Sequence, residues 1–268
     1  MLGAFALVIL LTMTMLGLFA PIIVHGTSPF SMDASAVLKA PGNGHLFGTD
    51  ELGRDVLTRI LYGARISLWV GFISVGISIG IGAPLGMLSA YAGKWVDFSI
   101  QRVVDAMFAF PTIILALAIV SVLGRGIVQV TIAVGIVAIP RVARVARAST
   151  LGVMAQPYIE ATTCMGATTA RVVFRHILPN IMGPLIVLGT AGFGSAILAE
   201  ASLSFLGVGT PPPQPSWGTM LSGGAQLYVR SAPYLAIVPG IAISLAVFGF
   251  NLLGDSLRDI FDPRLRGS

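Results

Sequence analysis

The amino-acid sequence predicts an all-α integral membrane protein with six membrane-spanning helices. Hydrophobic residues make up 55% of the 268 residues and charged residues only 10%, whereas soluble domains carry about 25% charged residues. The mean hydropathy of the chain is +0.90. Apolar blocks of about 20 residues, long enough to cross a bilayer as a helix, recur along the chain between shorter polar segments.

Six apolar blocks have the length of a membrane-spanning helix. The first lacks the basic start and the small-residue cleavage site of a signal peptide, so we expect it to remain as a helix. The expected spans are residues 2–24, 66–91, 103–123, 128–145, 183–206 and 234–253. The chain is thus expected to contain a first transmembrane helix (1–24), an extracytoplasmic loop (25–64) and a five-helix core (65–268) with a cytoplasmic loop at 157–182.

The distribution of basic residues predicts the orientation. Six spans place both termini on one side, and cytoplasmic segments carry the excess of Lys and Arg. With cytoplasmic termini, the inside segments hold Lys94, Arg102, Arg141, Arg144, Arg147, Arg171, Arg175, Arg258, Arg264 and Arg266. The outside segments hold Lys39, Arg54, Arg59, Arg65, Arg125 and Arg230. Both termini are therefore expected in the cytoplasm.

Composition also limits the kinds of partner. The net charge of +5 would suit nucleic acid, but the basic residues stand in short clusters between apolar blocks, which favours membrane topology and no nucleic-acid partner. The single cysteine, Cys164, excludes a disulfide within the chain and a metal site built from cysteines. The three histidines are dispersed, so no metal site is expected.

The stretch from Pro157 to Pro184 is helical in pattern, polar and cationic, and has too few consecutive apolar residues to cross a bilayer. Glu160 stands near a helix start, where the helix dipole favours a carboxylate. Gly166 would allow close approach of another backbone, and Pro179 is expected to end the helix. The residues alone leave two interpretations open: a cytoplasmic segment pushed by a partner protein, or a loop solvated by its charges.

Five residues of this stretch stand at a characteristic spacing: Glu160, Ala161, Gly166, Leu178 and Pro179. This spacing resembles the EAA loop of binding-protein-dependent ABC importer permeases, which reads Glu-Ala-Ala, three residues, Gly, nine residues and Ile-x-Leu-Pro. Here Thr162 replaces the third small residue, and His176 occupies the Ile position with Ile177 beside it. The form HILPN is similar to the peptide branch of the family.

Three further segments extend the resemblance over essentially the whole chain. They are LFGTDELGRDVLTRILYGARISL (46–68), LSFLGVGTPPPQPSWGTML (203–221) and NLLGDSLRDIFDPRLR (251–266). All three are similar to the "C" permeases of dipeptide, oligopeptide and nickel importers.

The resemblance implies the type I ABC importer permease fold in a bacterial plasma (inner) membrane. Such a permease pairs with a homologous second permease, and the substrate crosses between them. Two ATPase subunits, which bind ATP and Mg²⁺, lie beneath, and an extracytoplasmic substrate-binding protein docks outside. Closure of the ATPases moves the coupling helices, here about residues 160–170, and switches the pathway between inward- and outward-facing states. The implied coupling residues are Glu160, Ala161, Thr162, Gly166, Ala167, Arg171 and Pro179.

The resemblance also indicates the substrate class. Di- or oligopeptides are expected, with nickel or another small solute as the alternative. A rival of a different class, an ion-coupled secondary transporter, would carry ionisable residues near the midplane and usually an internal repeat. An intramembrane enzyme would need two deep Asp residues or a His-Glu zinc set. Neither signal is evident in the sequence.

The chain itself is not expected to be an enzyme or to bind a cofactor. It has no G-x-x-x-x-G-K-[ST] phosphate loop, and its only Gly-Lys pair, Gly93–Lys94, is followed by Trp95. ATP chemistry therefore belongs to another chain.

Asp50, Glu51, Arg54 and Asp55 bring both signs of charge together in the predicted outer loop. They would either order this loop and help to dock the binding protein, or form a local salt-bridged cap on the second span, which is the favoured interpretation. A calcium loop is excluded because the D-x-D-x-D-G pattern is absent.

Two acidic residues lie near the ends of spans. Glu200 follows Gly183 by about 17 residues, which at about 1.5 Å per residue places it near the outer boundary. A buried carboxylate there would be a candidate functional site, but the favoured interpretation is an interfacial Glu that is solvated or paired with a base. Asp105, near the inner end of the third span, has the same two interpretations.

Two basic segments are expected to face the cytoplasm. Arg141, Arg144 and Arg147 recur every three residues and are predicted to lie along one helix face. Anionic lipid or the ATPase could bind them, and topology anchoring is the favoured role. The tail, residues 254–268, mixes both signs of charge and is expected to lie against the ATPase.

Overall fold

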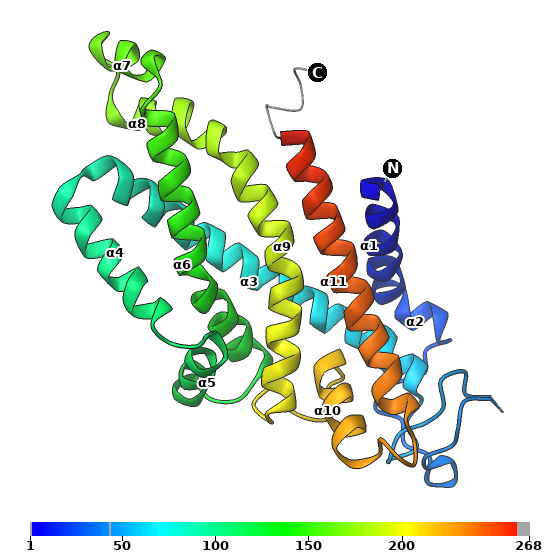
Figure 1. Ribbon diagram of the computed structural model, residues 1–268. Helices are drawn as coiled ribbons and strands as arrows, with labels where there is room; N and C mark the ends of the chain where they lie inside the picture. Colours follow the sequence, from blue (N-terminus) through cyan, green and yellow to red (C-terminus); the bar gives the residue numbers. More distant parts are fainter. Residues whose placement is uncertain (1, 43, 262–268) are drawn as a thin grey trace.

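The computed structural model describes residues 2–42 and 44–261, which form helices and connecting loops without a β-strand (Figure 1). The predicted all-α class is confirmed. The α-helices are α1 (Leu2–Leu18), α2 (Ala20–Ile23), α3 (Val56–Ala92), α4 (Lys94–Phe108), α5 (Thr112–Leu123), α6 (Ile127–Met154), α7 (Pro157–Cys164), α8 (Thr169–Arg171), α9 (Leu178–Phe205), α10 (Trp217–Leu227) and α11 (Tyr234–Phe261). A 3₁₀ turn, η1 (Ala34–Ala36), and a π-helical segment, η2 (Val172–Ile177), complete the regular structure of these residues.

Four helices of the described chain are long and apolar enough to cross a membrane. They are α3, α6, α11 and the continuous helix Thr169–Phe205 that includes α9. Helices α4 and α5 together make a fifth candidate, although they are bent by 96°. Helix α1 is apolar but only 17 residues long. The predicted count of six spans is therefore not confirmed.

The expected third span, residues 103–123, is broken in the middle. Helix α4 ends at Phe108, and α5 starts after Pro111, which is its N-cap. Proline has no backbone N–H and disfavours helical backbone in the residue before it, so the chain turns here. The expected span is therefore two helices that meet at Pro111 rather than one continuous helix.

Helix α3 begins at Val56, ahead of the expected start of the second span and inside the segment expected to be loop. The Asp55 side chain is the N-cap, and its Oδ2 accepts hydrogen bonds from the backbone N–H and the hydroxyl of Thr58, both at 2.8 Å. A capped N-terminus stabilises a helix that starts in the polar segment. Arg59 consequently belongs to α3 rather than to a loop.

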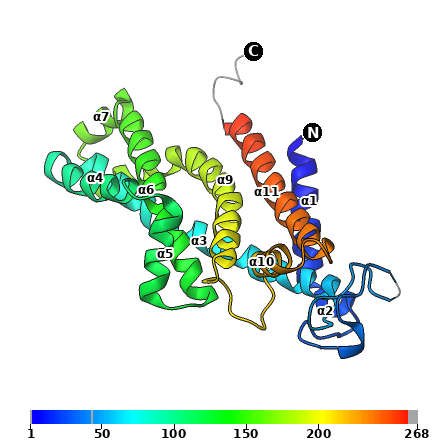
Figure 2. The ribbon, with the colours of Figure 1, turned by 60° about the horizontal axis from the view of Figure 1, so that its bottom comes forward.

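Glycines allow α3 and α6 to pack closely. A Cβ atom on Gly86 would lie 2.3 Å from the carbonyl oxygen of Ala143, and one on Gly82 would lie 2.7 Å from Cβ of Val142. Such small residues let the backbones of membrane helices approach. A second set of contacts packs α11 against α9 and α1. In both views α1 and α11 run side by side (Figures 1 and 2).

The connecting segments divide between the two ends of the long helices. Helix α7, the start of α1 and the end of α11 lie at one end, and α10 and the 25–55 segment lie at the other (Figure 1). Both described chain ends thus lie on the same side as α7. Residues 262–268, the end of the tail that was expected to meet the ATPase, lie outside the described residues.

Candidate functional site

Helix α7 forms an exposed cap at one end of the bundle. Pro157 occupies its first position, where the missing N–H is not needed, and Glu160 lies in the first turn. Ile159 is 6% exposed and belongs to an apolar cluster with side chains of α3, α6, η2 and α9. Burial of this one residue positions the short helix firmly on the ends of the long helices.

Helix α7 ends at Cys164, short of the expected end near residue 170, because Gly166 adopts a left-handed conformation with φ +82°. The N–H of Gly166 donates to the carbonyl of Thr163 at 2.9 Å, and the N–H of Ala167 donates to that of Thr162 at 3.3 Å. This pair of bonds is the Schellman motif that ends many helices. A Cβ atom on Gly166 would meet nothing within 4 Å. Within this chain, Gly166 is therefore required for its backbone conformation and not for close packing.

The chain then continues as one helix from Thr169 to Phe205. The expectation that Pro179 ends a helix is wrong, because Pro179 lies in the first turn of α9 and the helix runs through it. The π-helical segment η2 precedes this proline, and the wider turn relieves the clash of the ring with the carbonyl one turn earlier. Asn180 Nδ2 donates a hydrogen bond to the carbonyl of His176 at 2.6 Å.

The predicted coupling residues lie together around α7, with their side chains mainly in the open. Glu160, Ala161, Gly166, Arg171 and Pro179 are exposed, and Thr162 and Ala167 are half-buried. The neighbouring Cys164 is exposed and Met165 is 81% exposed. We call Glu160, Ala161, Cys164, Met165 and Gly166 the α7 surface. Among the described residues no side chain bonds to Glu160, so this surface is free to meet another chain.

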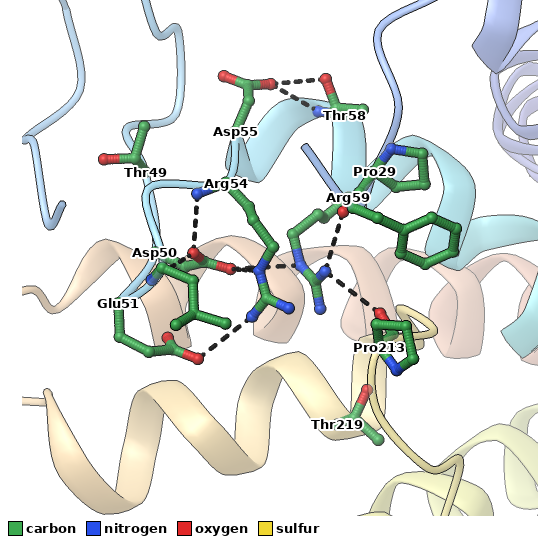
Figure 3. A network of polar contacts seen from close by, with 12 residues as sticks. Pro29, Thr49, Asp50, Glu51, Arg54, Asp55, Thr58, Arg59, Pro213 and Thr219 are labelled. Carbon is green, nitrogen blue, oxygen red and sulfur yellow. Dashed lines mark hydrogen bonds and ion pairs between the residues drawn. The ribbon is translucent and has the colours of Figure 1, made fainter. Parts of the chain in front are cut away.

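The outer charges form a network centred on Asp50 (Figure 3). Its Oδ2 accepts from Nε of Arg54 at 2.6 Å and lies 3.5 Å from Nε of Arg59. Its Oδ1 accepts from the backbone N–H groups of Leu52 and Arg54, both at 2.9 Å. Asp50, Arg54 and Arg59 are 6–7% exposed, so one carboxylate lies between two guanidinium groups away from bulk water, and Glu51 adds a second carboxylate 3.2 Å from Nη2 of Arg54.

Arg59 connects this network to distant segments (Figure 3). Its Nη1 donates to the carbonyl of Pro29 at 3.1 Å and to that of Pro213 at 3.5 Å. Asp55 caps α3, and its Oδ1 lies 3.0 Å from Nδ1 of His45. The charges thus act as a cap on α3 and also order the outer loops, so the two interpretations from the sequence overlap. Docking of a binding protein at Asp50, Arg54 and Asp55 stays a prediction.

Residues 82–267 match the family described as "Binding-protein-dependent transport system inner membrane component". The chain belongs to this family of transport permeases. It is 43% identical over 260 residues to the dipeptide transport system permease protein DppC of Alkalihalophilus pseudofirmus, covering 97% of this chain and 85% of the relative. It is 45% identical over 234 residues to the glutathione transport system permease protein GsiD of Pectobacterium atrosepticum, covering 87% and 77%. The resemblance seen in the sequence is confirmed.

Solved structures show the same fold. The permease matches an inward-facing MetNI methionine ABC transporter with a TM-score of 0.64 and 18% identity, over 76% of this chain and 96% of that chain. It also matches an amino acid ABC transporter with a TM-score of 0.54 and 20% identity, over 76% and 92%. The fold is therefore that of type I ABC importer permeases. The family is a transport component and not an enzyme.

In the permease, Glu200 is neither solvated nor paired with a base, so the favoured interpretation was wrong. It is 1% exposed, and its Oε1 accepts from the hydroxyls of Ser204 at 2.8 Å and Ser216 at 2.9 Å. The reason is α10, an unpredicted helix in the Pro- and Gly-rich loop, which covers the C-terminal end of α9. Ser216 and Thr219, the first and last residues of the segment S-W-G-T, form a reciprocal capping box at the start of α10. This pattern was the signal in the sequence that could have predicted the helix.

The permease uses two of its three clustered arginines to hold α4 against α6. Arg144 Nη2 donates to Asp105 at 2.7 Å, so Asp105 is paired with a base as favoured. Arg147 binds Asp97 through two hydrogen bonds. Within the described chain, no three His, Cys, Asp or Glu side chains are grouped so as to hold a metal ion.

Proposed function

We propose that this permease forms one half of the translocation pathway of an ATP-driven importer for di- or oligopeptides. The observation that carries the proposal is the 43% identity to a dipeptide permease over 97% of the chain. The glutathione permease supports the same class, because glutathione is itself a small peptide. The second wall of the pathway would come from a homologous permease subunit.

The α7 surface is the proposed contact with the ATPase subunits, which would bind ATP and Mg²⁺ in place of this chain. Ile159 fixes α7 to the ends of α3, α6 and α9, so a displacement of α7 would move these helices together. Met165 exposes an apolar side chain on a segment too short to lie across a bilayer. A partner protein that covers this side chain would remove apolar surface from water.

The proposed orientation follows from the same contact. The ATPases bind in the cytoplasm of a bacterial inner-membrane importer, so α7 and both chain ends would face the cytoplasm. The network around Asp50 and α10 would then face the extracytoplasmic binding protein. The positions of α7 and α10 at opposite ends of the long helices support this arrangement (Figure 1).

Reconstitution tests the function. The permease, its partner permease, the ATPases and the binding protein are assembled in proteoliposomes, with ATP inside and labelled dipeptide, glutathione or Ni²⁺ outside. We expect peptide uptake that requires both ATP and the binding protein. Uptake of Ni²⁺ alone would reassign the substrate. Ion-driven uptake by the chain without its partners would overturn the importer assignment.

Cys164 tests the α7 contact directly, because it is the single cysteine of the chain and is exposed on α7. We expect a membrane-impermeant maleimide to label it from the cytoplasmic side only. Labelling should slow at least tenfold when the ATPases are bound. Labelling from the outside would reverse the orientation, and an unchanged rate in the full complex would remove α7 from the ATPase contact.

A further inference from the structure

A cavity of about 300 Å³ lies between α3, α5, α6 and α9. Its volume is at the lower end of the roughly 300–1,000 Å³ found for small-ligand pockets. The walls are apolar side chains, glycines and hydroxyls, including Ser74, Ser78, Ile113 and Val137. A single charged side chain, Arg141 of α6, lines it.

Arg141 lies near the middle of α6, a helix of 28 residues. It follows Ile127, the first residue of α6, by about 14 residues, which corresponds to ~21 Å along the axis. The hydrocarbon core of a bilayer is about 30 Å thick. A charged side chain within a membrane-spanning helix is costly unless it is paired or faces a polar path, so Arg141, which is exposed in this chain and lines the cavity, indicates a functional site.

Arg141 has no partner among the described residues, in contrast to its neighbours. Arg144 and Arg147 are ion-paired with Asp105 and Asp97, whereas no hydrogen bond or ion pair joins Arg141 to the described chain. Val134, Ala138 and Arg141 recur at helical spacing and all line the cavity, so they share one face of α6. The Arg141 side chain thus adds an unpaired positive charge to the lining of the cavity.

The cavity offers two kinds of polar contact. A guanidinium binds a carboxylate through two parallel hydrogen bonds, and such a bond strengthens in apolar surroundings. The hydroxyls of Ser74 and Ser78 already donate to the carbonyls of Thr131 and Val75, both at 2.9 Å, so their oxygens are left as acceptors. A peptide supplies the complementary groups, namely one carboxylate and several N–H donors.

We propose that Arg141 binds the C-terminal carboxylate of the peptide during passage and so makes the permease select substrates with a free carboxyl end. The inference rests on the proposed peptide import and assigns the selectivity to one residue of this chain. The other candidate for pairing with Arg141 is an acidic side chain of the second permease subunit, and the test separates the two.

The test uses the complete importer in proteoliposomes and two substrates, one dipeptide with a free carboxyl end and the same dipeptide as its C-terminal amide. The wild type is compared with Arg141→Gln, Arg141→Lys and the control Arg144→Gln. Because one binding protein delivers both peptides to all variants, its own preference cancels when the ratio of free-acid to amide uptake is compared between variants. We expect Arg141→Gln to lower that ratio at least tenfold and Arg141→Lys to restore most of it.

The control Arg144→Gln should leave the ratio unchanged, since Arg144 pairs with Asp105. An unchanged uptake ratio in Arg141→Gln would overturn the proposal. If Arg141→Gln lowers uptake of both peptides equally and the second permease no longer co-purifies, Arg141 belongs to the subunit interface instead, which also overturns the proposal. If the amide is not delivered, a dipeptide with a photoreactive C-terminal residue replaces it, and absence of labelling on residues 134–145 overturns the proposal. A wild-type complex that imports no peptide would instead refute the proposed function.

Discussion

The guanidinium of Arg147 and the carboxylate of Asp97 bind through two parallel hydrogen bonds, 2.7 Å from Nε to Oδ1 and 2.6 Å from Nη2 to Oδ2. The hydroxyl of Ser89 donates to the same carboxylate. Three helices therefore meet at Asp97: Ser89 belongs to α3, Asp97 to α4 and Arg147 to α6. This contact holds the first half of the bent α4–α5 pair against the bundle.

A double-mutant cycle on Asp97→Asn and Arg147→Gln should give a coupling free energy of about 1–2 kcal/mol, because both side chains are mostly covered and the pair is bidentate. The measurement is unfolding of the purified permease by SDS titration in mixed micelles. The control is the Arg144–Asp105 pair, whose side chains are 53% and 55% exposed, with an expected coupling of about 0–1 kcal/mol. Equal coupling in the two pairs would contradict the assigned role of Asp97.

The three arginines also show where the sequence was interpreted wrongly. A spacing of three residues advances about 300° around an α-helix, so side chains at this spacing drift around the helix and do not form one face. Arg141 accordingly lines the cavity, whereas Arg147 meets α4. The pairing of Arg147 with Asp97 and of Arg144 with Asp105 depends on how α4 folds back after α3. A local sequence pattern does not show how two helices pack.

The long helices were the predictable part of the fold. Apolar composition alone located α3, α6, α9 and α11, because a helix that crosses a bilayer needs about 20 mainly apolar residues in succession. Boundaries depended on single capping residues such as Asp55 and Gly166. Helix α10 was missed because its stability comes from tertiary contacts: the Trp217 indole donates to the carbonyl of Ile60 at 3.1 Å in a buried cluster.

Loss of the Asp50 charge should strongly destabilise the loops that its network joins. Asp50→Asn leaves the buried guanidinium groups of Arg54 and Arg59 without their shared carboxylate, which we expect to cost about 3–5 kcal/mol. The matched control is Glu51→Gln, because the Glu51 side chain is 36% exposed and, among the described residues, forms one ion pair, with Arg54; its expected cost is below about 1 kcal/mol. SDS titration and protease cleavage within residues 25–55 measure the effect, and equal costs for the two variants would refute it.

Glu200 should act through its hydrogen-bonding oxygen. Glu200→Gln keeps an acceptor for the hydroxyls of Ser204 and Ser216, so we expect stability within about 1 kcal/mol of the wild type. Glu200→Ala removes the acceptor and opens a cavity beneath α10, at a cost of about 2–4 kcal/mol. The control is Ser202→Ala, since the hydroxyl of the half-buried Ser202 donates within its own helix, to the carbonyl of Leu198. If the Gln and Ala variants lose equal stability in the SDS titration, the carboxylate itself is required.

Gly166 should be required for coupling through its backbone angle. At φ +82° a side chain brings Cβ close to the following carbonyl, which costs about 1–2 kcal/mol and would re-aim the residues that follow α7. We expect peptide uptake by the full importer to fall severalfold in Gly166→Ala and further in Gly166→Val. Gly166→Asn should keep near wild-type uptake, because Asn tolerates left-handed backbone. Gly152→Ala is the matched control, since Gly152 is also open to solvent but lies in helical backbone. Wild-type uptake and binding-protein-stimulated ATP hydrolysis in Gly166→Val would show that the end of α7 has no part in coupling.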